Sequence, residues 1–277
     1  MPLSAGIVKR ATLMADGRDL IYFDDAATTL PPERAADARE LPSRPPTATM
    51  RLDPLTGECI SIATARPTRV MPPPKHLDPL APSTPENQSE VPGDYDVVVF
   101  ENRSPSFGPE PGEIPTAPAE PAITIGATAP SVGRCEVACL APEADGALSS
   151  LPVSRIRTIV EAWADRTEAL SKVPGVEQVF VFENRGEAIG VTLHHPHGQI
   201  YAYPFVTPRT RALLRSIESH GPGFFDELLA FEQAGERVLV RGEHFTAFVP
   251  FAARWPLEIH VLPHRHIPDL AATNEAE

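Results

Sequence analysis

The segment His194-His195-Pro196-His197-Gly198-Gln199 leads into Ile200-Tyr201-Ala202-Tyr203, a stretch with the β-branched and aromatic residues typical of a strand. Side chains on a strand alternate between its two faces. We therefore expect His195, His197 and Gln199 to point the same way. The sequence predicts a polar site on one face of a strand.

The chemistry open to these three side chains is narrow. A neutral imidazole is nucleophilic near pH 7, and its adduct with a phosphoryl group stays reactive, so His197 is a candidate covalent catalyst. Gln199 cannot exchange a proton usefully, but its amide can hydrogen-bond the charge that develops on a phosphate oxygen. This pair favours group transfer over hydrolysis. His195 either takes part directly or holds the backbone of the motif.

The pattern around the motif predicts an ordered arrangement of helices and strands from Leu151 onward. Apolar residues at helical spacing predict a helix that ends at Ser171, with Ser154 as its cap. Strands are expected at Asp96–Phe100, Gln178–Phe182, Ala188–Leu193, Gly198–Tyr203, Arg237–Val240 and Phe245–Phe251, and helices near Pro208–Ser219 and Gly223–Gln233.

Proline is frequent in the first half of the chain. The sequence contains 33 prolines, concentrated between Pro42 and Pro130, where they remove backbone donors and block helices and central strands. Residues 72–92 and 108–130 are therefore expected to be loops. The 42% hydrophobic content includes no run of about 18 apolar residues, so no transmembrane helix is expected.

Charge and cysteine content limit the possible partners. A net charge of −13 argues against binding to nucleic acid or to an acidic membrane, because both usually depend on clusters of Lys and Arg. The three cysteines, an odd number, are consistent with reduced thiols. Charged residues interrupt Met1–Asp19, which does not resemble a signal peptide. We expect a cytoplasmic protein.

Several segments together resemble the galactose-1-phosphate uridylyltransferase family of the histidine-triad superfamily. The active-site resemblance lies in Phe182–Gly186, Gly190–Thr192 and His195–Ala202, and Gln199 stands where the hydrolases of the superfamily carry a third histidine. Further similar segments, in the same order as in the family, are Arg51–Glu58, Tyr95–Arg103, Cys135–Pro142 and Trp255–Glu258. The resemblance covers residues 12–270 apart from the proline-rich insertions.

The resemblance implies an α+β fold that is histidine-triad-like, with a mainly antiparallel sheet, packed helices, one complete repeat and the start of a second. Residues 1–50 are expected to be a partly disordered N-terminal extension. Residues 51–207 would form the first repeat with the active-site motif, and residues 208–277 the linker helices and a truncated second repeat. Because the rest of that repeat contributes to the family's site, we expect a separately encoded C-terminal half, a homo-oligomer, or both.

The resemblance also implies the reaction of a UDP-glucose:hexose-1-phosphate uridylyltransferase. His197 would carry UMP between UDP-glucose and galactose 1-phosphate, with Gln199 and His195 beside it. The implied substrate-binding residues are Arg66, Arg69, Asn102, Asn184, Gly190 and Thr192. Arg66 and Arg69 are also open to a simpler interpretation as a solvated basic edge.

The family's zinc site is degraded in this sequence. Its ligand positions correspond to Asp78, Ala81, Ala144 and His195, of which only His195 is a good zinc ligand, and tetrahedral zinc needs three or four protein ligands. We therefore expect no metal and no other cofactor. Two alternatives remain open: a related nucleotidyltransferase or phosphorylase that acts on another nucleotide sugar, and a non-catalytic remnant or interaction module.

Overall fold

The computed structural model describes residues 3–4, 6–42, 48–62, 74–108, 125–126, 128–189, 191 and 193–277. The chain forms two compact units, Met1–Phe205 and Val206–Glu277. The fold is of the α+β class, with antiparallel sheets and separate helices. The two proline-rich segments that were expected to be loops lie partly outside the described residues.

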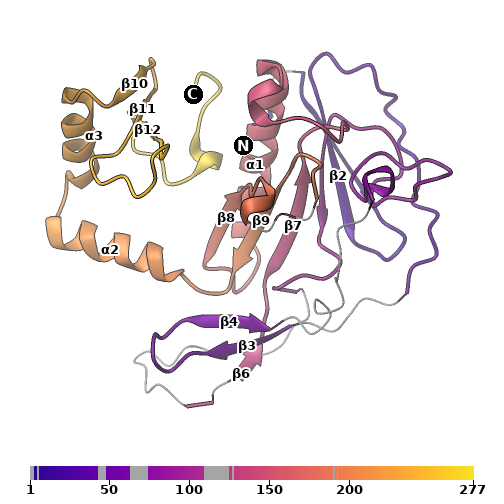
Figure 1. The fold of residues 1–277 in the computed structure, drawn as a ribbon, viewed down its shortest axis with the longest axis horizontal. Coiled ribbons are helices and arrows are strands. Elements are labelled where there is room, and N and C mark those ends of the chain that lie inside the picture. The colour runs from indigo at the N-terminus through magenta and orange to yellow at the C-terminus, as the bar shows by residue number, and fades with distance from the viewer. Residues whose placement is uncertain are drawn as a thin grey trace. The chain divides into compact units, whose positions relative to one another are not determined.

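The first unit is organised around a six-stranded sheet in the order β1-β2-β5-β7-β9-β8 (Figure 1). Every neighbouring pair in this sheet is antiparallel. The strands are β1 (Val8–Leu13), β2 (Asp19–Asp24), β5 (Val97–Glu101), β7 (Arg134–Cys139), β8 (Gln178–Phe182) and β9 (His197–Tyr203).

The expectation of an N-terminal extension over residues 1–50 is wrong for the β1–β2 hairpin. Strand β2 pairs with β5 from Leu20↔Phe100 to Phe23↔Val97, so the hairpin belongs to the main sheet. The segment from Leu20 to Phe23 is apolar without alternation and is buried on both faces. Such a pattern is typical of an interior strand.

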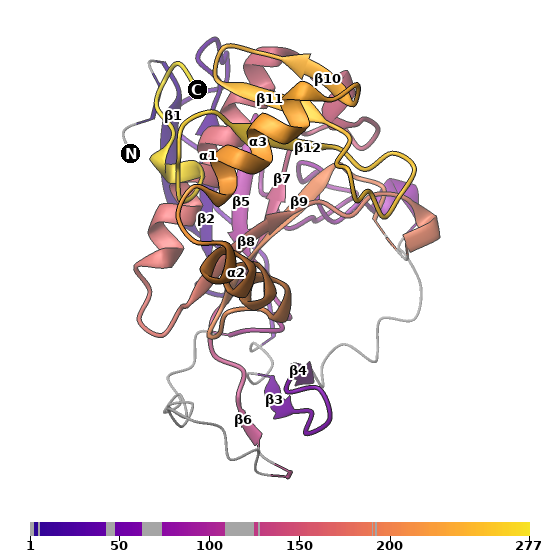
Figure 2. The ribbon, with the colours of Figure 1, turned by 90° about the vertical axis from the view of Figure 1, so that its left-hand side faces the viewer.

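The two faces of the main sheet are covered by different parts of the chain. Helix α1 (Val153–Ser171) lies along one face (Figure 2) and packs its Ile159 and Leu170 with Phe23 and Ile200 of the strands. Residues 74–95, which include the 3₁₀ turn η1 (Lys75–Leu77), cover apolar residues of the other face through Leu80, Val91 and Tyr95. Because both faces are buried, β5 reads as the continuous apolar run Val97-Val98-Val99-Phe100.

Two predicted details around β8 and α1 are wrong. The helix begins at Val153 after Pro152, and Ser154 lies inside its first turn without capping it, because proline already holds a backbone compatible with the start of a helix. The strand expected at Ala188–Leu193 is absent from its described residues, which include part of the 3₁₀ turn η3 (Glu187–Ile189). The ladder passes directly from β8 to β9, so no strand is needed between them.

A smaller antiparallel sheet in the first unit has the order β4-β3-β6. Its strands are β3 (Thr49–Leu52), β4 (Cys59–Ile62) and β6 (Thr128–Pro130). The Ser61 hydroxyl donates to the carbonyl of Ser106, and the Ser131 hydroxyl donates to Ser61. A short 3₁₀ turn, η2 (Leu148–Ser150), precedes α1.

The second unit contains two helices followed by a three-stranded antiparallel sheet. Helices α2 (Pro208–His220) and α3 (Phe224–Ala234) agree with the sequence prediction. The strands are β10 (Val238–Arg241), β11 (Phe245–Phe248) and β12 (His260–Pro263), and the 3₁₀ turn η4 (Leu270–Ala272) follows. The last predicted strand is confirmed but stops at Phe248, before Pro250 removes a backbone donor.

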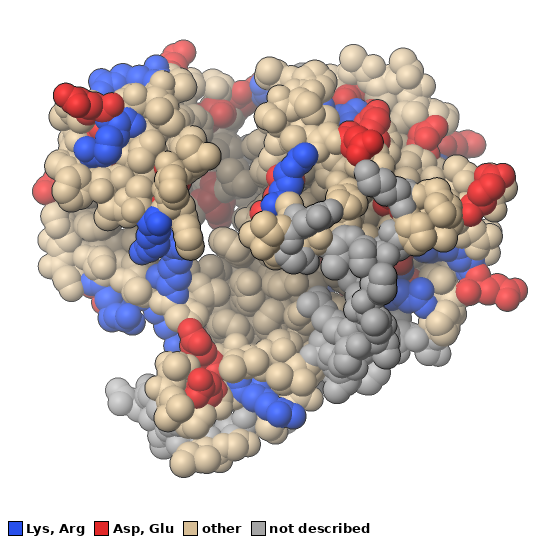
Figure 3. Space-filling model, in the orientation of Figure 1, with Lys and Arg blue, Asp and Glu red and all other residues tan. Residues whose placement is uncertain are grey.

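Charged side chains of both signs are interspersed over the described part of the first unit seen in Figure 3. None of the described helices is long and apolar enough to cross a membrane.

Candidate active site

The pleat of β9 separates the polar residues of the motif from the core. Ile200 and Ala202 are fully buried toward α1, whereas His197, Gln199 and Tyr201 are partly exposed and line a cavity of about 540 Å³. This alternation confirms that His197 and Gln199 lie on the same face of a strand.

The register of the sheet brings further residues to this larger cavity. Gln199 lies opposite Val137 of β7 and Phe182 of β8, so these three side chains share a face. Asn102 follows the end of β5 and Asn184 follows the end of β8, and both line the cavity. The structure thus brings four of the predicted site residues together.

Four other predicted residues cannot be placed. Arg66, Arg69, Gly190 and Thr192 lie outside the described residues. Their assignment as binding residues stays a prediction.

The ring of His197 is oriented by the backbone of its own motif. Its Nδ1 lies 2.7 Å from the carbonyl oxygen of His195. Because a carbonyl only accepts, Nδ1 carries the proton and the neutral ring has its lone pair on Nε2. The geometry therefore leaves Nε2 as the nucleophilic nitrogen.

The prediction that His195 shares the strand face with His197 is wrong. Strand β9 begins at His197, where the ladder with β7 ends at Cys139↔His197, so the two-residue period does not extend back to His195. The imidazole of His195 is buried and does not line the larger cavity. Its Nδ1 lies 2.7 Å from Asp78, and its Nε2 lies 2.8 Å from the carbonyl of Ala141 and 2.9 Å from the hydroxyl of Tyr95.

Asp78 is held in its charged form by these contacts. Burial alone would raise the pKa of Asp78, but hydrogen bonds from His195 and from the Leu80 amide lower the pKa below its usual value. His195 therefore fastens the segment that contains Asp78 to the start of β9. This arrangement supports the interpretation of His195 as the residue that holds the motif.

The residues at the expected zinc position do not fit the metal. Asp78 and His195 are hydrogen-bonded to each other, while Ala81 and Ala144 offer no side-chain donor. Within the described residues, no group of three or more His, Cys, Asp or Glu side chains is placed to hold a metal ion.

A smaller cavity of about 230 Å³ adjoins the larger one at the His194–His197 segment. Both cavities are lined by His197 and Asn184. The smaller cavity is also lined by Arg185 and His194, and the larger one is not. His197 thus lies where the two cavities meet, and both cavities have mixed polar and apolar walls.

Three charged residues of the larger cavity, Arg18, Glu90 and Arg103, were not predicted as site residues, although Arg103 ends the Tyr95–Arg103 segment of the resemblance. Arg18, between β1 and β2, donates to Asp16 and to Glu90 at 2.8 Å and 2.6 Å, and to the carbonyl of Glu101 at 2.8 Å. Arg18 and Glu90 both line the cavity. Their sequence neighbourhoods are a short turn and a proline-rich loop, neither of which carries a motif, so no signal in the sequence could have found them.

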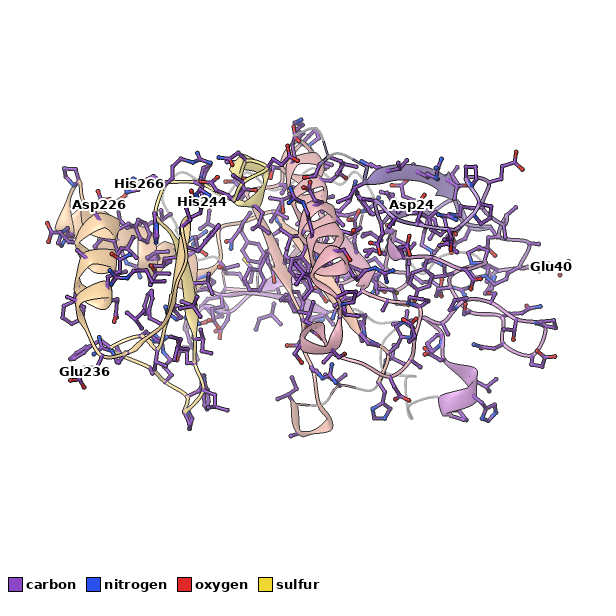
Figure 4. All side chains as sticks on the ribbon, turned by 90° about the horizontal axis from the view of Figure 1, so that it is seen from above. Asp24, Glu40, Asp226, Glu236, His244 and His266 are labelled. Carbon is purple, nitrogen blue, oxygen red and sulfur yellow. The ribbon has the colours of Figure 1, made fainter. Side chains whose placement is uncertain are left out.

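The histidines near the C-terminal end of the described chain have their side-chain partners within the second unit. His266 pairs with Asp226 at 2.8 Å (Figure 4), whereas His264 contacts Thr246 and Gln233. His260 pairs with Glu258 at 3.0 Å. Each histidine has its own partners, and the three do not form a cluster.

Comparison with known proteins agrees with this geometry. Residues 46–207 match the family described as galactose-1-phosphate uridyl transferase, N-terminal domain. The chain is 44% identical to the galactose-1-phosphate uridylyltransferase of Streptomyces lividans over 273 residues, which cover 97% of this chain and 70% of the relative. The corresponding enzyme of Thermotoga maritima is 36% identical over 82% of this chain and 70% of its own length.

Solved structures give the same result. A uridylyltransferase structure superposes with a TM-score of 0.68 at 31% identity, covering 83% of this chain and 70% of that one. The fold and these relatives identify the class of the protein as a nucleotidyltransferase, an enzyme that transfers a nucleotidyl group. The chain belongs to the galactose-1-phosphate uridylyltransferase family.

Proposed function

We propose that this protein exchanges UMP between UDP-glucose and galactose 1-phosphate through a covalent intermediate on His197. The observation that carries the proposal is the hydrogen bond from Nδ1 of His197 to the carbonyl of His195, beside Gln199 on the same strand face. Membership of the uridylyltransferase family supports the reaction class.

The reaction would proceed in two balanced displacements. Nε2 of His197 attacks the α-phosphorus of UDP-glucose, a P–N bond forms, and the bond to the bridging oxygen breaks to release glucose 1-phosphate. A phosphate oxygen of galactose 1-phosphate then attacks the same phosphorus and breaks the P–N bond. UDP-galactose leaves and His197 is regenerated.

The backbone of the motif would stabilise the intermediate. When Nε2 is bonded to phosphorus, the ring keeps its Nδ1 proton and becomes cationic, and the carbonyl of His195 lies 2.7 Å from that nitrogen. Sugar phosphates leave without protonation, so no general acid is required at position 199. The amide of Gln199 would donate a hydrogen bond to a non-bridging oxygen of the transferred phosphoryl group.

Asn102 and Asn184 would bind the nucleotide sugar, because both line the larger cavity with His197. The resemblance adds Arg66, Arg69, Gly190 and Thr192 as further substrate-binding residues. The separately encoded C-terminal half and the homo-oligomer also stay predictions. A separately encoded chain that increases transfer would support the first of these two predictions.

The test is intact-mass spectrometry of the purified chain after incubation with UDP-glucose. We expect an increase by one uridylyl group that disappears on addition of galactose 1-phosphate. The variant His197→Ala should form no adduct, and His266→Ala, which removes an exposed imidazole that lines neither cavity, serves as the control for general damage. An adduct that persists in His197→Ala would end the proposal, as would an adduct from ADP-glucose in preference to UDP-glucose.

A further inference from the structure

The carboxylate of Glu90 has one oxygen held in place and the other free. Its Oε2 accepts hydrogen bonds from Nη2 of Arg18 at 2.6 Å and from Nη2 of Arg39 at 3.4 Å. Within the described part of the chain, Oε1 accepts no hydrogen bond from the protein. It is not a buried unpaired atom, so it is accessible to solvent. The side chain of Glu90 is 20% exposed and lines the larger cavity.

Both arginines are themselves oriented by further contacts. Arg18 is fully buried, and its other two guanidinium nitrogens, Nε and Nη1, donate to Asp16 and to the carbonyl of Glu101. Arg39 is paired with Asp37 at 2.8 Å. Burial alone would raise the pKa of Asp37, but hydrogen bonds from Arg39 and from the Ala15 amide lower the pKa to about 2. The Asp37 carboxylate that orients Arg39 is therefore charged at neutral pH.

An oriented carboxylate oxygen selects a particular kind of ligand group. Ionised carboxylates only accept hydrogen bonds, so Oε1 suits a hydroxyl donor and repels a phosphate. Hydrogen bonds to charged acceptors are also stronger than those between neutral groups. Glu90 therefore fits a sugar hydroxyl rather than the reacting phosphoryl group.

The two cavities indicate which sugar that is. The larger cavity, of about 540 Å³, has aromatic walls at Phe182 and Tyr201 that suit a base. The smaller one, of about 230 Å³, has no Phe, Tyr or Trp among its described lining residues, and its Arg185 can donate to a phosphate. With the reacting phosphorus at His197, the nucleoside would occupy the larger cavity and the hexose 1-phosphate the smaller. Glu90 lines the larger one, which places it on the side of the ribose.

We propose that Glu90 binds a ribose hydroxyl of the nucleotide and that Arg18 and Arg39 are positioning residues that hold its carboxylate. The inference rests on the proposed function for the identity of the nucleotide. Its geometry depends only on the contacts around Glu90.

The test compares equilibrium binding of UMP with binding of its 2′-deoxy and 3′-deoxy analogues, measured by calorimetry on the full chain and on Glu90→Gln. Removal of one charged hydrogen bond is expected to weaken binding about 10-fold. The affinity for UMP should therefore be about 10-fold lower in Glu90→Gln than in the unaltered protein. One deoxy analogue should bind the unaltered protein about 10-fold more weakly than UMP. The same analogue should bind both proteins equally, because the contact is already absent.

Controls separate this contact from other effects. Glu86→Gln alters an exposed carboxylate in the same loop and should leave all affinities unchanged. Arg39→Met should weaken the binding of UMP but not that of the deoxy analogue that lacks the contact. Arg39→Lys should weaken the binding of UMP less than Arg39→Met does.

Three outcomes would overturn the proposal. The first is that the deoxy analogues lose the same affinity relative to UMP on the unaltered protein and on Glu90→Gln, and the second is that UMP does not bind measurably. The third is that Glu90→Gln weakens binding of glucose 1-phosphate but not of 2-deoxyglucose 1-phosphate, which would place Glu90 at the hexose. UMP cannot transfer its phosphoryl group, so the result is independent of adduct formation on His197. A missing adduct with intact ribose coupling would contradict the proposed function alone.

Discussion

At the scale of single residues, the site depends on the position at which β9 begins. Because β9 starts at His197, the residues before it are released from the pleat, and His195 turns into the protein to meet Asp78 and Tyr95. Its backbone carbonyl still reaches the ring of His197. Two histidines only two positions apart therefore have different surroundings: His197 lines the larger cavity, and His195 is buried against Asp78 and Tyr95.

Gln199 offers a test of why the site transfers rather than hydrolyses. The change Gln199→His places a group that can exchange protons on the strand face beside His197, so water activation should improve. We expect the ratio of UDP-glucose hydrolysis to uridylyl transfer to increase about 10-fold or more, measured from released UMP and UDP-galactose. Val191→Ile, elsewhere on the cavity wall, should leave the ratio unchanged. An unaltered ratio in Gln199→His would contradict this role.

Asp37 makes a specific contribution to the acid stability of the protein. Its pKa is lowered to about 2 in the folded protein from 3.8, so its stabilising contribution is present above pH 4 and is lost as the pH falls toward 2. We expect Asp37→Asn to reduce the dependence of the free energy of unfolding on pH between 4 and 2, measured by urea denaturation. Glu33→Gln, which removes an exposed carboxyl in the same segment, should change this pH dependence little.

At the scale of elements, the sequence predicts the strands and helices whose patterns are locally complete. Strand Gln178–Phe182 and helices α2 and α3 agree with the expectation because their apolar spacing and flanking breakers lie within each segment. The His197–Gln199 pair was predictable for the same reason. The hairpin β1–β2 was not, because its place in the sheet depends on pairing with β5, more than 70 residues away.

The long-range contacts of β2 can be tested by removing a core side chain. Phe23 is fully buried between the sheet and α1, so Phe23→Ala should lower the free energy of unfolding by about 3 to 5 kcal/mol. Val8→Ala, on the neighbouring strand where the side chain is 40% exposed, should cost less than about 1 kcal/mol. Denaturant titration would measure both, and a small loss for Phe23→Ala would show that the hairpin is not integral to the core.

At the scale of the whole molecule, the two units differ in how much apolar surface they bury. Phe248 is the one hydrophobic residue of Val206–Glu277 that is almost entirely buried, whereas Met1–Phe205 has two extended clusters of buried side chains among its described residues. Local stability follows the density of buried apolar contacts. The second unit should therefore open more readily than the first.

Hydrogen exchange would measure that difference directly. Amides of β11 should exchange at least about 10-fold faster than those of β7, even though both are central strands of their sheets. Phe248→Leu should increase exchange in the second unit and leave β7 unchanged. Equal protection of the two strands would contradict this difference in local stability.

Aromatic side chains of β8 and β9, together with Phe107 and Phe205, form a continuous series of ring contacts. The rings of Phe180, Phe182, Tyr201, Tyr203, Phe205 and Phe107 follow one another at centroid distances between 5.1 and 6.1 Å. Neighbouring rings at such distances share their electronic transitions, so their near-ultraviolet circular dichroism depends on the orientation of every member. Phe182 and Tyr201 also line the larger cavity, and the array is therefore a built-in optical reporter of its occupancy.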